Sequence, residues 1–243
     1  MPNVTGERSK RAVDLKTFPS FSGLDGCVLD AMMRHAVVYR LKRRELLYQQ
    51  GEEAHSIYVI QQGGVRLIEH TSDGQQVNIK VYGTGDLLGL LSISGSYPHP
   101  SSAEAIDDTQ VIGISGDTMR QLIGCHPVLG LWIVDLLVNH VHHAHSRIRH
   151  LVAERVEQRL ARGLLHYCEK FGHRVDDDFV SIDITLSQQD MADFSGTTLE
   201  TVNRTLKAWE DKGYIRRARQ HIDVLNCSAL AQLVEERPYL MQG

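Results

Sequence analysis

The stretch TLSQQDMADFSGTTLETVNRTLKAWEDKGYI, residues 185–215, constrains the fold more tightly than any other part of this chain. Ser187-x-x-Asp190 is a helix-start signal, and Ser195-Gly196 ends this first helix after about two turns. Thr197-x-x-Glu200 predicts the start of a second helix, which Gly213 ends. Apolar residues recur along the second helix at spacings of three and four: Leu199, Val202, Leu206 and Trp209. We therefore expect two short helices joined by a tight turn that contains glycine.

The opposite face of the second helix is polar, and the segment that follows this helix is basic. IRRARQHIDVL, residues 215–225, predicts a short β-hairpin, so the region as a whole indicates a winged helix-turn-helix. In such a module one helix enters the major groove of DNA, where Arg can bind guanine and Glu can bind cytosine. We expect Glu200, Asn203 and Arg204 to read base edges. Phosphate contacts, which position the protein without reading sequence, are expected from Lys207, Arg216, Arg217 and Arg219.

Two other interpretations of this region stay open at this point. Glu200 and Arg204 are four residues apart, so they could form an ion pair that only stabilises their own helix. A helix-turn-helix can also be a docking surface, and the chain would then be a small-molecule-binding module that regulates a protein partner. Selection from random DNA duplexes would separate the two functions, because only a DNA-binding dimer would enrich an inverted repeat.

Residues 36–115 alternate between turn signals and short runs that are rich in β-branched and aromatic residues. The runs are VVYRL, ELLYQQ, SIYVIQQG, VRLIEH, VNIKVY and TQVIGIS. Asp73-Gly74, between VRLIEH and VNIKVY, predicts a hairpin turn. Many short strands at close spacing predict a β-barrel or a β-sandwich. Residues 1–22 show no clear period, so we expect a flexible arm there.

From about residue 117 onward the pattern becomes helical, and one long helix is predicted from residue 127 to about residue 152. Spacings of four and three along it form a heptad seam, which we expect to pack against a second copy of the chain. The seam consists of Val134, Val138, Val141, His145, Ile148 and Val152. A second stripe beside it is expected to pack on the β-domain: Ile133, Leu137, Ala144 and Leu151.

The composition limits the classes of function. A net charge of −4 provides no overall attraction to nucleic acid or anionic lipid, so any DNA contact must come from a local basic patch. The longest apolar stretch, residues 128–138, is too short to cross a bilayer of about 30 Å. The N-terminus lacks the apolar core of a signal peptide, so we expect a cytoplasmic protein without membrane contact. We find no nucleophile elbow, P-loop, dinucleotide fingerprint or H-E-x-x-H motif, and we therefore do not expect an enzyme.

The four cysteines, Cys27, Cys125, Cys168 and Cys227, are widely scattered and include no C-x-x-C pair. This spacing argues against a zinc finger or a clustered iron–sulfur site. Isolated thiols suit a reducing compartment. Cys227, directly after the predicted wing, is either an ordinary thiol or a redox brake on DNA binding.

Three segments carry a resemblance to a known family: LYQQGEEAHSIYVIQQGGVRL, YGTGDLLG and GTTLETVNRTLKAWEDKGYI. Around them the layout over about residues 20–230 is similar to that of the cyclic-AMP receptor and fumarate–nitrate regulator (CRP/FNR) family. The resemblance implies a bacterial transcription regulator that binds palindromic promoter DNA as a homodimer and contacts RNA polymerase. It also implies an α+β fold with four parts: an arm at residues 1–22, an antiparallel β-roll at 23–126, a dimerisation helix at 127–153 and a winged helix-turn-helix at 154–243.

In that family the recognition helix carries a Glu and, four residues later, an Arg, and Glu200 and Arg204 match both. The cyclic-AMP receptor has another Arg directly before the Glu, where this chain has Leu199. This difference favours the FNR-like subgroup, whose half-sites are similar to TTGAT rather than GTGA. The FNR-like pattern has Ser at the position of Asn203. Two more phosphate contacts are expected: Gln188, which occupies a phosphate-contacting position of the first helix, and Thr198.

The cyclic-nucleotide pocket of the family has a Gly-Glu-Leu turn followed by an Arg-Ser-Ala run. This chain has Gly89-Leu90-Leu91 and Ser101-Ser102-Ala103 there, so both charged residues are absent. A buried phosphate without a charged partner is unfavourable, and we therefore expect no cyclic-AMP binding. Gly89, Leu90, Ser101 and Ser102 would form a vestigial effector pocket that binds an uncharged or apolar ligand, or nothing. We expect no cofactor, and the sequence does not identify the effector.

Other sensor chemistries have less support in the residues. FNR-type oxygen sensing needs clustered N-terminal cysteines, and Cys27 stands alone. His99, in YPHP, is a weak candidate for a haem ligand. NHVHHAHSRIRH, residues 139–150, carries five histidines near the end of the long helix. They could hold a metal, form a pH-sensitive interface at His145, or be a solvated or register-setting helix face; we favour the last and expect no metal site.

Overall fold

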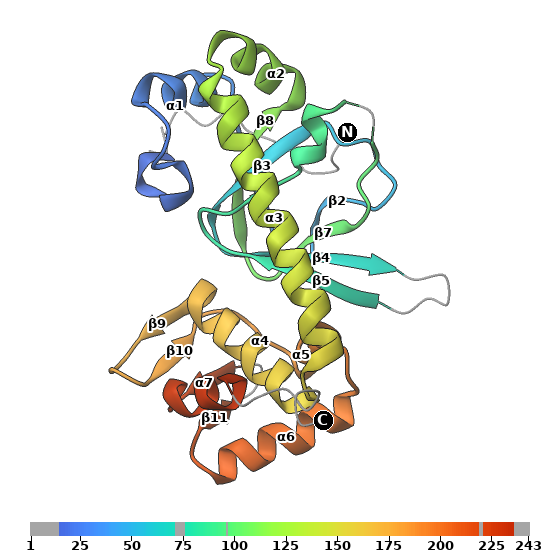
Figure 1. The fold of residues 1–243 in the computed structure, drawn as a ribbon, viewed down its shortest axis with the longest axis vertical. Helices are drawn as coiled ribbons and strands as arrows, with labels where there is room; N and C mark the ends of the chain where they lie inside the picture. Colours follow the sequence, from blue (N-terminus) through green and yellow to red (C-terminus); the bar gives the residue numbers. More distant parts are fainter. Residues whose placement is uncertain (1–14, 71–75, 96, 219–220, 236–243) are drawn as a thin grey trace. The chain divides into compact units, whose positions relative to one another are not determined.

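A computed structural model of the chain describes residues 15–70, 76–95, 97–218 and 221–235. Two compact units make up the chain, Met1–His140 and Val141–Gly243 (Figure 1). The α-helices are α1 (Gly26–Met33), α2 (Gly116–Cys125), α3 (Val128–Ala153), α4 (Val156–Phe171), α5 (Gln188–Ser195), α6 (Leu199–Asp211) and α7 (Cys227–Glu235). The 3-10 helices are η1 (Leu15–Thr17), η2 (Pro19–Phe21) and η3 (Leu90–Ile93). The strands are β1 (Val37–Leu41), β2 (Leu46–Tyr48), β3 (Ser56–Gln62), β4 (Val65–His70), β5 (Gln76–Tyr82), β6 (Leu87–Leu88), β7 (Ser102–Ala105), β8 (Thr109–Ser115), β9 (Gly172–Arg174), β10 (Val180–Ile182), β11 (Ile215–Ala218) and β12 (His221–Val224).

Two antiparallel sheets form the β-roll of the N-terminal unit. Their strand orders are β1-β8-β3-β6 and β2-β7-β4-β5. In the β3–β8 pair, Ile57 lies opposite Ile114 and Val59 lies opposite Ile112. β4 and β5 pair as the predicted hairpin, although its turn at Asp73-Gly74 lies outside the described residues. The predicted α+β class with an N-terminal antiparallel β-roll is confirmed.

Strand β3 is apolar along most of its length because the sheet that contains it is covered on both faces. Successive side chains of a strand point to opposite faces. Ile57 and Val59 belong to one buried cluster, whereas Tyr58 and Ile60 belong to another. The second cluster includes residues of both sheets and fills the inside of the roll. The first cluster joins the outer face of the β1-β8-β3-β6 sheet to the helices.

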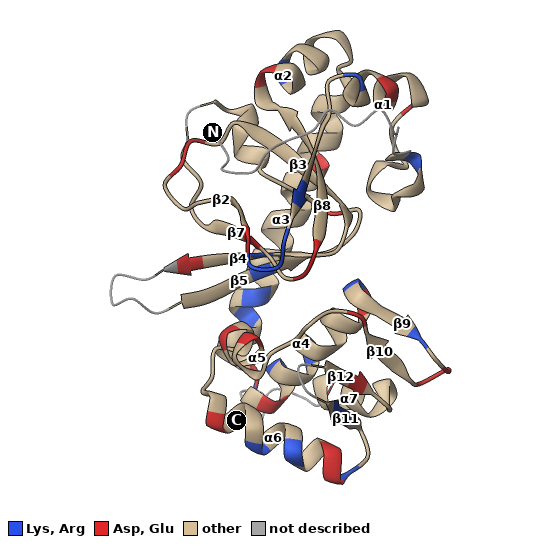
Figure 2. Ribbon diagram, turned by 180° about the vertical axis from the view of Figure 1, so that it is seen from behind, with Lys and Arg blue, Asp and Glu red and all other residues tan. Residues whose placement is uncertain are grey.

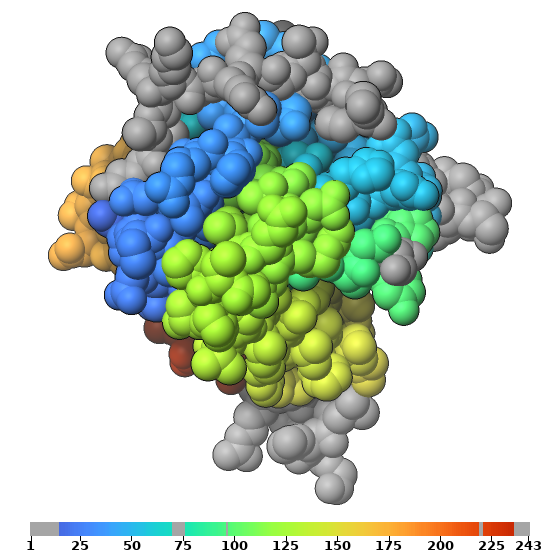
Figure 3. All heavy atoms as spheres, turned by 90° about the horizontal axis from the view of Figure 1, so that it is seen from above, coloured from blue at the N-terminus to red at the C-terminus, as the bar shows by residue number. Residues whose placement is uncertain are grey.

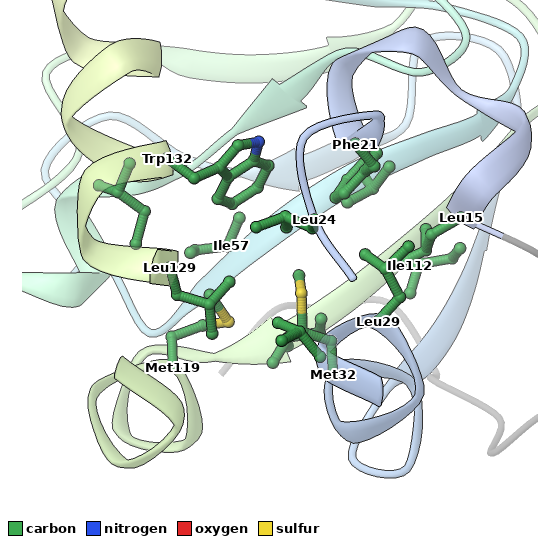
Figure 4. Packing of buried hydrophobic residues seen from close by; sticks show 14 of the residues in the cluster. Leu15, Phe21, Leu24, Leu29, Met32, Ile57, Ile112, Met119, Leu129 and Trp132 are labelled. Atoms are coloured by element: carbon green, nitrogen blue, oxygen red, sulfur yellow. The ribbon is translucent and has the colours of Figure 1, made fainter. Parts of the chain in front are cut away.

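The helices of the N-terminal unit pack on this outer face. Met32 of α1, Met119 of α2 and Trp132 of α3 meet Ile57 and Ile112 of the sheet (Figure 4). In the space-filling view, the blue segment that contains α1 lies directly against the green segment that contains α2 and the start of α3 (Figure 3). The first turns of the long helix are thereby held on the sheet by a shared core.

The arm predicted for residues 1–22 is packed in its last part. Some of this arm lies outside the described residues, but Leu15 and Phe21 are buried in the cluster on the outer face of the sheet. The Trp132 indole N–H donates to the Ser20 carbonyl at 2.9 Å, and the ring centroids of Phe21 and Trp132 are 5.3 Å apart. The prediction of a flexible arm is wrong for this segment. Its packing partner, Trp132, lies more than a hundred residues away in the chain, and a local sequence pattern cannot indicate so distant a contact.

The sequence patterns also missed α1, β6, β7, β9 and α7. Strand β7 has the sequence SAEA, in which small and acidic residues provide no strand signal. It is nevertheless paired on both sides, with β2 and with β4. β2 and β4 supply the backbone hydrogen-bond partners that hold β7 as a strand, although the residues of β7 do not favour one.

The C-terminal unit combines α4 to α7 with a third antiparallel sheet of order β11-β12-β10-β9. In the β11–β12 pair, Arg216 lies opposite Asp223. α4 contacts α5, and α5 contacts α6, as a helix-turn-helix requires. The predicted winged helix-turn-helix is present. The two units divide between His140 and Val141, inside α3, and the predicted domain boundaries stay predictions.

Candidate nucleic-acid interface

Local hydrogen bonds explain why α5 begins and ends where the sequence predicts. Ser187 is the N-cap: its hydroxyl oxygen accepts from the Asp190 N–H at 3.1 Å, and the Asp190 carboxylate accepts from the Ser187 N–H at 3.0 Å. Gly196 follows the last residue of α5 with a φ of +59°. Glycine adopts this left-handed conformation without steric cost, so the chain can turn directly toward α6.

The second helix begins one residue later than Thr197-x-x-Glu200 predicts. Its N-cap is Thr198, whose hydroxyl oxygen accepts from the Thr201 N–H at 3.3 Å. Leu199 was expected on the apolar side of this helix, but it is 43% exposed. It occupies the first position of α6, ahead of Val202, where the buried stripe begins. The apolar side chain of Leu199 therefore lies on the surface, next to Glu200 in the sequence.

The burial of one side of α6 determines which of its residues face solvent. Val202, Leu206 and Trp209 are fully buried. The Trp209 indole N–H donates to the Glu157 carboxylate of α4 at 3.0 Å. Because a buried indole N–H needs a partner, this bond sets the rotation of α6 about its axis.

The outer side of α6 carries the residues predicted to read DNA. Glu200, Arg204 and Lys207 are exposed and Asn203 is half-buried. Figure 2 shows acidic and basic residues interspersed along this helix. Within the part of the chain that the structure describes, the side chains of Glu200 and Arg204 form no ion pair. Their charged groups are therefore available to a ligand. Gln188, at the first position of α5, is half-buried.

The wing arginines are engaged in ion pairs within the protein. Arg216 donates from Nε and Nη2 to Asp223 Oδ2 at 3.0 and 2.6 Å. Arg217 donates from Nε and Nη2 to Glu210 Oε2 at 2.9 and 2.7 Å. Arg219 lies outside the described residues. The sequence did not indicate these pairs, because each depends on how β11 lies against β12 or against α6.

Both acidic partners are held in their ionised form. Burial would raise the pKa of Asp223, but hydrogen bonds from Ser181, Arg216 and His221 together lower it below its usual value. Hydrogen bonds from Arg217 likewise lower the pKa of Glu210. The positive charge of the wing is therefore smaller than its number of arginines suggests. The Arg216 side chain is 62% exposed and the Arg217 side chain 24%, so Arg216 is the more accessible of the two.

Two arginines from other helices hold the C-terminal end of α5. Arg159 of α4 donates from Nε to the Ser195 carbonyl at 2.8 Å and from Nη2 to the Gly196 carbonyl at 3.3 Å. Arg147 of α3 donates to the Phe194 carbonyl at 3.2 Å, and its guanidinium lies 4.9 Å from the centre of the Phe194 ring. Cations at a helix C-terminus satisfy its last carbonyls and complement its dipole. These contacts anchor the turn between α5 and α6, and no local sequence pattern indicates either arginine.

Two family models match the two units of the chain. The cyclic nucleotide-binding domain matches residues 38–125, and the Crp-like helix-turn-helix domain matches residues 158–233. Together they cover more than half of the sequence. The chain belongs to the CRP/FNR family. It is a DNA-binding transcription regulator.

Known members of the CRP/FNR family are similar to this regulator over most of its length. The fumarate and nitrate reduction regulatory protein of Escherichia coli K12 is 28% identical over 193 residues, which cover 79% of this chain and 76% of that protein. A CRP-like cAMP-activated global transcriptional regulator of Mycobacterium tuberculosis is 24% identical over 212 residues, or 87% of this chain and 94% of that one. The structure of FixK2 from Bradyrhizobium japonicum superposes with a TM-score of 0.71 at 25% identity, covering 82% of this chain and 96% of that one.

The positions of the predicted effector pocket fall on two segments of the β-roll of this CRP/FNR regulator, one beside η3 and one at the start of β7. Gly89 directly precedes η3, Leu90 is its first residue, Ser101 directly precedes β7 and Ser102 is its first residue. Gly89 has a φ of +80°, and a Cβ there would lie 2.4 Å from the Ser56 carbonyl oxygen, so this turn needs glycine. The buried Ser102 hydroxyl accepts from the Gln50 N–H at 2.9 Å. This hydroxyl therefore supports the fold of the roll.

Aromatic side chains contribute to the core inside the roll. Tyr48, Tyr58 and Tyr82 are buried in the cluster between the two sheets. The ring centroids of Tyr48 and Tyr58 are 6.0 Å apart, and those of Tyr39 and Tyr58 are 5.9 Å apart. Burial raises the pKa of Tyr58 to about 12 and also raises the pKa of Tyr48 and of Tyr82. These phenols are therefore neutral and present an uncharged aromatic surface.

His99, the weak candidate for a haem ligand, packs inside this unit. Its ring is stacked on that of Tyr48 with the centroids 3.6 Å apart and the planes 8° from parallel. The residue is 4% exposed, and burial lowers the pKa of its imidazole to about 4. The His99 ring is therefore neutral at physiological pH and contributes to packing, while its role as a ligand stays a prediction.

The long helix α3 exposes an apolar surface. The aliphatic residues of the predicted seam, Val134, Val138, Val141, Ile148 and Val152, are 48–72% exposed, and His145 is exposed as well. Of the second stripe, Ile133 is buried, but Leu137 and Leu151 are 46% and 45% exposed and Ala144 is exposed. Within the N-terminal unit, Ile133 is therefore packed as expected of this stripe, whereas Leu137 is not. In the described ranges no helix has the length and apolar content that a membrane span requires.

The histidines of residues 139–150 differ in their surroundings. His142, His143 and His145 are exposed, whereas His150 is half-buried with Nε2 3.9 Å from the Glu154 carboxylate. Burial and the nearby Arg162 lower the pKa of His150. Among the residues that the structure describes, no group of three or more His, Cys, Asp or Glu side chains is arranged to hold a metal ion.

Proposed function

We propose that this regulator binds, as a homodimer, a palindromic DNA site whose half-sites are similar to TTGAT, and that it does so without cyclic AMP. The observation that supports this most directly is the outer side of α6, where the Glu200 and Arg204 side chains are exposed one turn apart and form no ion pair with other described residues. Arg can bind guanine O6 and N7, and Glu can accept from cytosine N4. An RNA polymerase contact at such a promoter is part of the proposal.

The proposed base contacts can be separated from phosphate contacts by mutation. Selection from a random duplex library should enrich an inverted repeat with half-sites about one helical turn, roughly 34 Å, apart. Arg204→Ala should weaken the selected site by about 1–3 kcal/mol and relax the preference at one position of each half-site. Lys207→Ala, on the same exposed side, should instead weaken all duplexes equally and reduce the salt slope by about 1. Enrichment of no repeat would contradict the proposal.

The remaining phosphate contacts that we propose are Gln188, Thr198, Arg216 and Arg217. The Thr198 hydroxyl oxygen caps α6 and lies 3.0 Å from the Thr201 hydroxyl, and when Thr201 donates in that pair the Thr198 hydroxyl can donate to a phosphate. Arg216 can offer its remaining N–H groups while it stays paired with Asp223, whereas Arg217 must turn away from Glu210. We therefore expect a larger loss of affinity from Arg216→Ala than from Arg217→Ala at low salt.

The exposed seam of α3 supports the homodimer. Several valine and isoleucine side chains at heptad spacing are about half exposed or more in one chain, and knobs-into-holes packing with a second copy would bury them. Val138→Asp places a charge in this seam and should produce a monomer in light scattering, with reduced affinity for a palindrome. Val175→Asp is the control, because Val175 is 53% exposed and lies outside α3. A Val138→Asp variant that keeps the mass of the parent would exclude this seam as the interface.

Two observations support independence from cyclic AMP. Leu90 and Ser101 stand where the family pocket has its Glu and Arg, so a bound phosphate would lack a charged partner. The inside of the roll is filled by aliphatic residues and neutral tyrosines, which offer no charged partner to a phosphate. Calorimetric titration of the full-length protein with cyclic AMP should therefore show no binding, and DNA affinity should not change when the nucleotide is added. Micromolar binding would overturn this part of the proposal and leave the DNA site untouched.

A further inference from the structure

Cys168 and Cys227 are far apart in sequence but adjacent in the C-terminal unit. Cys168 lies in the last turn of α4, and Cys227 is the first residue of α7. The two helices are in contact, and the Gln158 side-chain amide of α4 donates to the Leu233 carbonyl of α7 at 3.2 Å. Both cysteines are partly buried, and each thiol shifts the pKa of the other, as neighbouring side chains at the facing ends of two packed helices do. These cysteines are isolated in the sequence, and the fold brings them together.

The backbone around both thiols is held by hydrogen bonds, so their adjacency is built into the fold. The Cys168 carbonyl accepts from the N–H of Gly172, which ends α4. The Cys227 N–H donates to the Asp178 carbonyl at 3.0 Å. Ser228 donates from its N–H and its hydroxyl to the Asp178 carboxylate at 2.9 and 2.7 Å. The loop before β10 thereby positions the start of α7 beside the end of α4.

We propose that Cys168 and Cys227 are a modification site at which a low-molecular-weight disulfide, such as oxidised glutathione, produces a reversible intramolecular disulfide. The Cys227 thiolate attacks one sulfur of the small disulfide, forming a mixed disulfide and releasing one thiolate. The Cys168 thiolate then attacks the Cys227 sulfur, forming the protein disulfide and releasing the second thiolate. The protein loses two electrons and two protons, and the small disulfide becomes two thiols.

The order of the two steps follows from the surroundings of the thiols. Burial raises the pKa of Cys168 to about 12. The interaction between the two thiols also raises the pKa of Cys168, and it lowers that of Cys227. Burial nevertheless leaves the pKa of Cys227 above its usual value. Both thiols are therefore mainly protonated at neutral pH, and the exchange should become faster as pH rises, because the thiolate is the nucleophile.

The cross-link would enclose the DNA-reading elements in a covalent loop. Residues 169–226 lie between the two cysteines and include β9 to β12, α5 and α6. A disulfide that closes a loop of this length reduces the entropy of the unfolded chain. We expect the unfolding temperature of the C-terminal unit to rise by roughly 10 °C on oxidation and to return when the disulfide is reduced.

Peptide mapping of the full-length protein after treatment with oxidised glutathione tests the proposal. We expect a linked Cys168–Cys227 peptide that is two hydrogens lighter than the reduced pair, whereas the exposed Cys27 and Cys125 should carry only glutathione adducts. Cys168→Ser should trap a glutathione adduct on Cys227, and a Cys27→Ser/Cys125→Ser double variant should still form the linked peptide. Glutathione adducts on Cys168 and Cys227 without a linked peptide, or an unfolding temperature that does not change on oxidation, would overturn the proposal. The wild-type map needs no variant to fold, so the test does not depend on the substitutions.

Discussion

Replacing Arg159 tests whether the helix-turn-helix depends on the cations at the end of α5. Arg159→Met keeps most of the side-chain volume but removes the donors to the carbonyls of Glu154, Ser195 and Gly196. A hydrogen bond from a charged donor contributes about 1.5–3 kcal/mol, and less where solvent can replace it. The bonds to Glu154 and Ser195 are partly buried and the bond to Gly196 is exposed. We therefore expect the unfolding free energy of the C-terminal unit to fall by about 3 kcal/mol.

The two tryptophans allow this loss to be assigned to one unit. Trp132 is buried in the N-terminal unit and Trp209 in the C-terminal unit. In a Trp132→Phe background, Trp209 fluorescence during urea unfolding reports the C-terminal unit. Arg149→Met removes an exposed arginine from α3 and should change stability by at most about 0.5 kcal/mol. If Arg159→Met unfolds at the same urea concentration as Arg149→Met, the contacts of Arg159 do not stabilise the C-terminal unit.

Three further changes have expected outcomes. The folded-state pKa of His99, about 4, is below the usual value of 6.5, so the stability that it contributes is present above pH 6.5 and is lost as pH falls toward 4. The loss should approach about 3 kcal/mol in pH-dependent unfolding, and His99→Phe should remove most of that dependence. Gly89→Ala places a Cβ 2.4 Å from the Ser56 carbonyl oxygen, at a residue whose φ is +80°. In urea unfolding this change should destabilise the N-terminal unit by at least about 2 kcal/mol. Little change would show that the turn can relax. Glu210→Gln removes the carboxylate that pairs with Arg217. In a binding titration, DNA affinity should therefore increase and the salt slope should steepen by about one phosphate contact. An unchanged slope would mean that Arg217 does not reach the DNA backbone.

The features that the sequence predicted well are those whose causes are local. The capping residues Ser187 and Asp190 are three positions apart, and Gly196 needs only its own backbone to adopt a positive φ. The spacing of Val202, Leu206 and Trp209 places them on one side of a helix because of helix geometry alone. They are therefore buried in any fold that covers that side. The resemblance of the recognition helix to the CRP/FNR pattern is local in the same sense.

The features that the sequence missed depend on partners that are distant in the chain. Strand β7 exists because β2 and β4 lie on either side of it, and its own residues do not favour a strand. The exposure of Leu199 depends on where the buried stripe of α6 begins, one turn after the helix starts. In the wing, pairing between β11 and β12 is what places Asp223 beside Arg216.

By itself, the sequence predicted the recognition helix, and the resemblance to the CRP/FNR family indicated that Leu90 and Ser101 stand where the family pocket has its Glu and Arg. The helical period is enough for the first prediction, and the second follows from the resemblance, so neither needs contacts between distant residues. Only the tertiary structure decided which cations are neutralised, which apolar residues of α3 stay exposed, and that Cys168 meets Cys227. Those outcomes depend on distances between residues that are far apart in the chain, and such distances exist only after the sheets and helices have packed.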